Sequence, residues 1–79
     1  MKATQLAANQ TVITDGDTSR FQSYESIIAV IKGGKVTLDR SMWDYSKTTS
    51  KYRSQFLRET TKETRVKIAD GTYQLADLN

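Results

Sequence analysis

The stretch that decides the fold is residues 27–39, Ile27-Ile28-Ala29-Val30-Ile31-Lys32-Gly33-Gly34-Lys35-Val36-Thr37-Leu38-Asp39. Two β-rich runs are joined by a pair of glycines, which suits the primed turns that connect antiparallel strands without splaying them. Counting outward from the turn pairs Ile31 with Val36 and Ala29 with Leu38. We therefore expect a hairpin over residues 26–39 whose core-facing side carries these four residues.

The same alternation assigns Ile27 to the core face and Ile28 and Val30 to the opposite face. The rest of that opposite face carries lysine, threonine and aspartate, so it is apolar only at one end and we expect it to be partly covered. The glycine pair is not a phosphate-binding loop, because neither the Walker pattern nor the dinucleotide fingerprint accompanies it.

A second hairpin is expected upstream. Residues 11–14, Thr-Val-Ile-Thr, form a β-rich run that stops at Asp15-Gly16-Asp17, and residues 20–24 supply a second extended segment with Phe21 as its apolar anchor. Asp15-Gly16-Asp17 resembles the start of a calcium loop but lacks the later ligands and the closing glutamate, so we interpret it as a turn. Residues 1–9 contain too few apolar residues to define an element and are expected to form a flexible lead.

Downstream of residue 44 the apolar period changes to that of a helix. Tyr45, Thr49, Tyr52 and Phe56 share one side, and the residues displaced by about 200 degrees from them form a basic stripe. The members of this stripe are Lys47, Lys51, Ser54 and Arg58.

A second helix is expected to begin at Thr60, because Thr60-x-x-Glu63 is a capping-box pattern, and to stop at Gly71. Residues 65–68 and 72–75 could instead form a hairpin around Asp70-Gly71. Helix and hairpin both remain open from the sequence, with the helix favoured. In the helical interpretation, residues 73–78 return as a short strand or an extended tail.

With 79 residues the chain has material for one core, so we expect a single α+β domain over residues 10–79. Its small antiparallel sheet, formed by the hairpin 26–39 and the N-terminal strands, should pack on one or two C-terminal helices. The first nine residues carry no apolar stretch of the length that a signal peptide needs, and no run approaches the roughly 20 residues that span a bilayer. We expect neither export nor a membrane segment.

The absence of cysteine and histidine excludes disulfides, thiolate metal sites and the commonest general base. Among possible paired carboxylates, Glu59 and Glu63 lie four residues apart, but Glu63 already has a role as a cap, and neither occupies an apolar setting that would raise its pKa. We therefore expect no enzymatic activity, no metal and no cofactor.

Charge is concentrated in one segment. Residues 40–58 contain five basic side chains and one acidic one, for a net charge of +4, whereas residues 1–39 sum to zero and residues 59–79 to −1. Aromatic residues interleave with these cations, so the segment is the candidate interaction surface. Its proposed members are Arg40, Trp43, Tyr45, Lys47, Lys51, Arg53 and Arg58.

The same pattern has a purely structural interpretation, in which the aromatics of the helix lie in the core and its lysines are solvated. Trp43 likewise has two alternatives: a lid on the core with its indole N–H on a loop carbonyl, or an interface anchor. Because the aromatics lie opposite the lysines, we expect Tyr52 and Phe56 to hold the fold and the basic face, with Trp43, to bind.

Four motifs lie close together in the second half of the chain: Trp43-Asp44-Tyr45-Ser46, residues 48–52 (Thr-Thr-Ser-Lys-Tyr), Phe56-Leu57 and residues 59–64 (Glu-Thr-Thr-Lys-Glu-Thr). Through these motifs residues 43–64 resemble a group of short uncharacterised proteins encoded by tailed bacteriophages. Phe21-Gln22-Ser23-Tyr24 and residues 26–29 are similar to the opening of those proteins, so the likeness covers about residues 20–78. At Arg58, similar sequences tend to have a small residue such as glycine.

The resemblance implies a phage origin and transfers no activity onto particular residues. Small phage proteins often bind host machinery or defence complexes, which is an argument by analogy. The leading hypothesis is a non-enzymatic phage accessory protein that binds a host or phage protein in the host cell cytoplasm. The alternatives are a small nucleic-acid-binding module and a homo-oligomeric structural or assembly protein.

Overall fold

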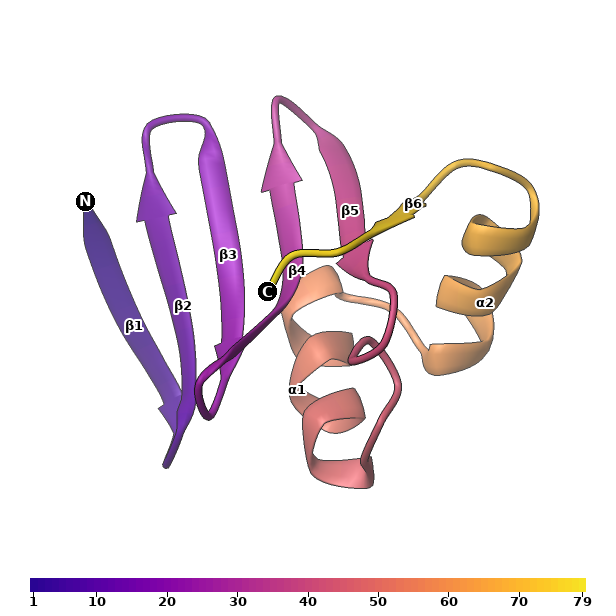
Figure 1. Ribbon diagram of the computed structural model, residues 1–79. Coiled ribbons are helices and arrows are strands. Elements are labelled where there is room, and N and C mark those ends of the chain that lie inside the picture. Colours follow the sequence, from indigo (N-terminus) through magenta and orange to yellow (C-terminus); the bar gives the residue numbers. More distant parts are fainter.

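The computed structural model describes residues 1–79, which form a six-stranded sheet and two helices (Figure 1). The strands follow one another across the sheet in the order β1-β2-β3-β4-β5-β6. The elements, in chain order, are β1 Lys2–Ala7, β2 Gln10–Asp15, β3 Thr18–Ser23, β4 Ser26–Lys32, β5 Lys35–Asp39, α1 Lys47–Leu57, α2 Thr61–Ala69 and β6 Gln74–Ala76. This is the α+β arrangement that the sequence predicts.

The first five strands form an antiparallel meander with two-residue connections. At the β4–β5 turn Gly33 and Gly34 both have positive φ, 56° and 81°, as a type I′ turn requires. Ile31 pairs with Val36 and Ala29 with Leu38, so the predicted register is confirmed. The predicted upstream hairpin is also confirmed, as β2 pairs with β3 from Gln10↔Ser23 to Asp15↔Thr18.

The assignment of Ile28 to the outer face is wrong, and a β-bulge explains why. The β3–β4 register shifts between Phe21↔Ala29 and Gln22↔Ile27, which leaves Ile28 as an extra residue in β4. A bulge interrupts the alternation of side chains between the two faces. Ile28 consequently joins the core at 0% exposure, whereas Ile27 is only half-buried.

The first residues form a strand where the sequence predicts a flexible lead. Strand β1 pairs with β2 from Lys2↔Thr14 onward, and a bulge separates Gln5 from Ala7. The turn that follows uses Asn9 at a φ of 63°, a left-handed conformation that asparagine tolerates better than most residues. Composition alone concealed this strand because its side chains are small or polar and most of them remain exposed.

Helix α1 begins and ends at residues with clear local roles. The hydroxyl of Ser46, the N-cap, accepts a hydrogen bond from the Thr49 N–H at 3.1 Å. At the other end Arg58 is left-handed (φ 58°, ψ 44°), and its N–H donates to the carbonyl of Ser54. The helix must therefore stop at Arg58, in a conformation where glycine is the usual residue.

The choice between helix and hairpin after residue 60 is settled in favour of the helix. Thr60 and Glu63 form the predicted capping box at the start of α2, and Gly71 follows the helix with a φ of 86°. The chain then returns as β6, which pairs in parallel with β5. Beyond β6, the Leu78 N–H donates to Asp39, and the Asn79 side-chain amide exchanges two hydrogen bonds with the backbone of Ile27.

The core lies between the sheet and the helices. Its fully buried apolar residues are contributed by β3, β4 and β5, and α1 contacts β2, β3 and β4. Phe56 of α1 stacks on Phe21 with ring centroids 5.9 Å apart. Strand β1 lies at the edge farthest from both helices (Figure 1). Neither helix has the length and hydrophobicity needed to cross a lipid bilayer.

Candidate functional site

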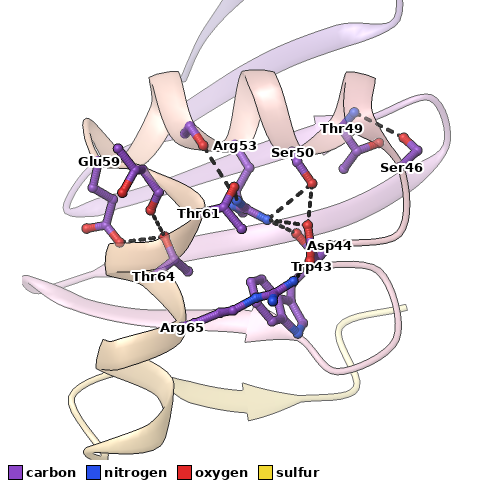
Figure 2. A network of polar contacts seen from close by, with 12 residues as sticks. Trp43, Asp44, Ser46, Thr49, Ser50, Arg53, Glu59, Thr61, Thr64 and Arg65 are labelled. Atoms are coloured by element: carbon purple, nitrogen blue, oxygen red, sulfur yellow. Dashed lines mark hydrogen bonds and ion pairs between the residues drawn. The ribbon is translucent and has the colours of Figure 1, made fainter.

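A fully buried arginine organises the region in which the sequence places the candidate interface. Arg53, on α1, is 0% exposed and donates hydrogen bonds to the Trp43 carbonyl and to the Thr61 hydroxyl at 2.7 Å. Its guanidinium lies 3.6 Å from the Asp44 carboxylate. A buried cation needs such compensation, because removing it from water is strongly unfavourable. Arg53 therefore joins the loop after β5, α1 and the start of α2 (Figure 2).

Two guanidinium groups lie over the ring of Trp43. The guanidinium carbon of Arg53 lies 5.1 Å from the centroid of the Trp43 ring. That of Arg65, on α2, lies 5.8 Å from the same centroid. Arg65 also pairs with the Asp44 carboxylate, as seen in Figure 2. The indole is half-buried and packs against the core, and its N–H forms no hydrogen bond to a loop carbonyl. Trp43 thus holds the two helices to the loop through cation–π contacts.

Glu59 is the centre of a second cluster, between the two helices and β6. Its side chain is 4% exposed and accepts hydrogen bonds from Thr64 and Tyr73, both at 2.6 Å, and from Lys67 at 2.8 Å. Glu63 caps α2 instead of facing Glu59. The two carboxylates are therefore not arranged as an acid–base pair, and no group of three or more acidic side chains could hold a metal ion.

The pKa values of the carboxyls follow from these contacts. Burial by itself raises the pKa of Asp44, but hydrogen bonds from Ser50 and Arg65 and the charges of Arg53 and Arg65 lower it below its ordinary value. For Glu59, burial is likewise outweighed by hydrogen bonds from Lys67, Thr64 and Tyr73, so its pKa is lowered too. These contacts therefore favour the charged form of both carboxyls.

A polar patch also lies between α1 and the sheet. Ser23 of β3 and Thr49 of α1 share a hydrogen bond of 3.1 Å, and both are buried. Gln10 of β2 is 1% exposed, and neither its amide nitrogen nor its amide oxygen has a hydrogen-bond partner. An unpaired buried amide is destabilising, so the packing between α1 and the sheet at Gln10 is not optimised for stability.

The outer side of α1 presents a continuous positively charged surface. Lys47, Lys51, Gln55 and Arg58 are all exposed and lie within about 80 degrees of one another around the helix axis. We call these four residues the α1 basic face. None of the four ion pairs involves Lys47, Lys51 or Arg58. Tyr45, 52% exposed, lies just before the helix.

The structure divides the seven predicted surface residues into two groups. Tyr45, Lys47, Lys51 and Arg58 are exposed and remain candidates for an interface. Arg53 is buried, so its assignment to an exposed surface is wrong, and Trp43 is occupied by its two arginines. Arg40 contacts the C-terminal segment, where it lies 3.9 Å from Asp77 and donates to the Leu75 carbonyl at 3.5 Å.

The predicted basic stripe is corrected at one position. Ser54 is half-buried, and its hydroxyl accepts a 3.5 Å hydrogen bond from Arg53, so the exposed residue at this level of the helix is Gln55. The sequence pattern does not reveal that Arg65 contacts Trp43 and Asp44, or that the Glu59 side chain points inward. One feature of the sequence indicates that Arg53 is buried. It lies next to Tyr52 on the inner side of the helix, where a cation requires a carboxylate partner.

The surface has two shallow hollows. One, of about 400 Å³, follows α2 and is lined mainly by charged residues around Val66, which is 57% exposed. The other, of about 320 Å³, lies beside the β5–β6 pair. Thr72 borders both.

Comparison with known proteins identifies a family without identifying an activity. No curated protein and no solved structure matches the chain. One family model matches residues 1–71, and the match includes the residues that form β1. Since this covers most of the 79 residues, the chain belongs to a family of unknown function, DUF8033.

Proposed function

We propose that the protein is a non-enzymatic accessory protein of a bacteriophage that binds an acidic surface of a host or phage protein in the host cell cytoplasm. The α1 basic face is the binding surface. The observation that carries the proposal is that Lys47, Lys51 and Arg58 are exposed side by side with no acidic partner. The phage origin rests on the resemblance of residues 43–64.

The neighbouring carboxylates support this role because they point inward. Asp44 is engaged by Arg53 and Arg65, and Glu59 by Lys67, so neither neutralises the α1 basic face. Helix α1 itself contains no acidic residue. The positive potential of its surface is therefore uncompensated within the domain and available to attract an acidic partner.

The position of Lys47 adds a second argument. It is the first residue of α1, where the partial positive charge of the helix terminus disfavours a cation and favours Asp or Glu. No acidic residue occupies that first turn. A charge that is unfavourable for the helix is consistent with selection for binding.

Nucleic acid is the second candidate, and Tyr45 is the observation that favours it. Its ring is 52% exposed and directly precedes the N-cap Ser46 and Lys47. An exposed aromatic beside cations can stack on a base while the cations contact phosphates. The other aromatics of the segment, Tyr52 and Phe56, pack against the core and are not available for stacking.

Affinity capture from host lysate tests the proposal. Wild type is compared with Lys47→Glu/Lys51→Glu, and with Lys32→Glu/Lys35→Glu as a control that makes the same charge change at exposed residues of the β4–β5 turn. We expect a partner that wild type and the control retain and the α1 variant loses. Identical capture by all three proteins would refute the α1 basic face as the binding surface.

A salt titration separates the two candidates. Binding of single- or double-stranded oligonucleotides that weakens steeply with salt, and that Tyr45→Ala also weakens, would establish the nucleic-acid alternative. No binding at low salt would eliminate it.

A further inference from the structure

The two edges of the sheet differ in length and in how far the rest of the chain covers them. At one edge β6 has only three residues, and the chain beyond it is fixed by hydrogen bonds from Leu78 to Asp39 and between Asn79 and Ile27. At the other edge β1 has six residues and no neighbour on its outer side. Figure 1 shows this edge clear of both helices. An uncovered edge of this length is a template for another strand.

The turn geometry fixes which backbone groups of β1 are free. Asp15 and Thr18 flank a two-residue turn, so they exchange both hydrogen bonds, and Asp15, Ile13 and Thr11 direct their backbone groups toward β3. Alternate residues of β2, namely Thr14 and Val12, must then face β1, where they pair with Lys2 and Thr4. The N–H and C=O groups of Ala3 and Gln5 consequently point away from the sheet.

This pattern is self-complementary, and we propose that a second copy of this chain pairs with β1 in antiparallel orientation about a two-fold axis at Thr4. Ala3 of each copy then exchanges N–H···O=C bonds with Gln5 of the second copy. The two Thr4 residues lie opposite each other as the non-hydrogen-bonded pair between them. Every free backbone group between residues 3 and 5 gains a partner in this register.

The side chains permit the same register. Ala3, Thr4 and Gln5 are small or uncharged and exposed, so their side chains bring no charge to the centre of the new pair. Lys2 falls opposite Leu6 of the second copy, and the two lysines lie at opposite ends of the pair. Strand β1 has no proline and no inward-pointing charge, two features that commonly protect sheet edges. Its bulge lies after Gln5, outside the hydrogen-bonded residues 3–5.

The resulting dimer has a defined shape. The two-fold axis is perpendicular to the sheet, so the two six-stranded sheets become one continuous sheet with the α1 helices of both copies on the same face. Strand β1 is at the edge farthest from α1, so pairing leaves both α1 basic faces exposed. The dimer would present two of these faces to one partner. Its formation through β1 does not depend on what the α1 basic faces bind.

Charge placed at the two-fold axis provides the first test. We expect the untagged protein to sediment as a dimer, twice its 8.9 kDa mass, at the upper end of about a hundredfold concentration range. Thr4→Lys and Thr4→Glu each place like charges opposite one another and should be monomeric, whereas their equimolar mixture should dimerise again. Thr48→Lys, at an exposed residue of α1, is the matched control and should dimerise like wild type.

Amide hydrogen exchange provides a second test that needs no substitution. The N–H groups of Ala3 and Gln5 should become protected as concentration rises, while the N–H groups of Lys2 and Thr4, already bonded to β2, should change little. A monomer throughout the concentration range would overturn the proposal. So would a dimer that survives both Thr4 variants, or one in which Ala3 and Gln5 stay unprotected.

Discussion

The meander of residues 2–39 and the helical region of residues 40–79 are stabilised by different forces. All four ion pairs lie within residues 40–77, and none involves a residue of the meander, although residues 1–39 contain four basic and four acidic side chains. The meander combines hydrogen-bonded pairing between adjacent strands with the fully buried apolar residues of β3, β4 and β5. The helices add to their apolar contacts a few charged side chains, above all Arg53 and Glu59.

This difference indicates how a chain of 79 residues holds two short helices with few buried apolar side chains. Only Thr49 and Arg53 of α1 and Thr64 of α2 are fully buried, and none of these is apolar. Specific polar contacts therefore supplement the partly buried apolar residues through which the helices pack on the core. Losing one of these charged side chains should therefore destabilise the protein more than losing a charged side chain of the meander that forms no ion pair.

Replacing the buried arginine should have the largest effect. Arg53→Ala leaves Asp44 partly buried with a lost partner and opens a cavity beneath Trp43, so the free energy of unfolding should fall by about 3–5 kcal/mol. Arg20→Ala, at a half-buried arginine of the meander with no ion pair, should cost less than about 1 kcal/mol. Urea denaturation measures both. Equal losses would abolish the contrast between the two regions.

Neutralising Glu59 should have the next largest effect and should change the response to acid. Glu59→Gln weakens the bonds from Lys67 and Tyr73, at a loss of about 1–3 kcal/mol near neutral pH. Because the folded-state pKa of Glu59 is lowered, its charged form stabilises the fold above the unfolded pKa of about 4.3, and this stabilisation is lost as pH falls through the folded pKa.

The wild type and Glu59→Gln should therefore converge in stability as the pH decreases below about 4. Thermal unfolding followed by circular dichroism from neutral to acidic pH measures this convergence. A difference that stays constant over that range would show that Glu59 acts through packing and not through its charge.

A substitution in the meander should act in the opposite direction. Gln10→Met removes a buried amide that has no hydrogen-bond partner and keeps a similar volume, so stability should increase by about 1 kcal/mol. Gln22→Met is the control, since Gln22 donates to the Tyr24 carbonyl and is only half-buried. It should give no increase. Chemical denaturation distinguishes the two, and a destabilised Gln10→Met would show that the amide is satisfied in solution.

The smallest effect is expected at the junction of the helices. Arg58→Gly relieves a left-handed conformation that suits glycine, so it should stabilise the protein by about 0.5–1 kcal/mol. Gln55→Gly, inside α1, should instead destabilise it by about 1 kcal/mol. If thermal denaturation showed the same loss of stability for both glycine variants, the left-handed conformation of Arg58 would not be a source of strain. Arg58→Gly also removes one cation of the α1 basic face, so it should weaken capture of the partner.

The sequence was informative where local rules govern the structure. Alternation and the glycine pair predict the register of β4 and β5, and the capping box predicts the start of α2. It was uninformative where the outcome depends on distant side chains. Nothing near Arg53 in the chain shows that Thr61 and the Trp43 carbonyl will surround it, so a position next to exposed lysines was interpreted as exposed.

The same reason applies to Ile28 and to β1. The bulge that turns Ile28 into the core depends on how β3 meets β4, and β1 is a strand because β2 offers it an edge, not because its own residues favour one. Of the candidate interface, the exposed cations of α1 could be predicted from helical periodicity.

The parallel pairing of β6 has a consequence for the time course of folding. Each hairpin of the meander joins neighbouring segments and can form as the chain leaves the ribosome, whereas β5 acquires its second neighbour only when residues 74–76 have been synthesised. The Asn79 amide then bonds to Ile27, 52 residues earlier in the chain. A residue that is synthesised well after the meander thus secures the start of β4.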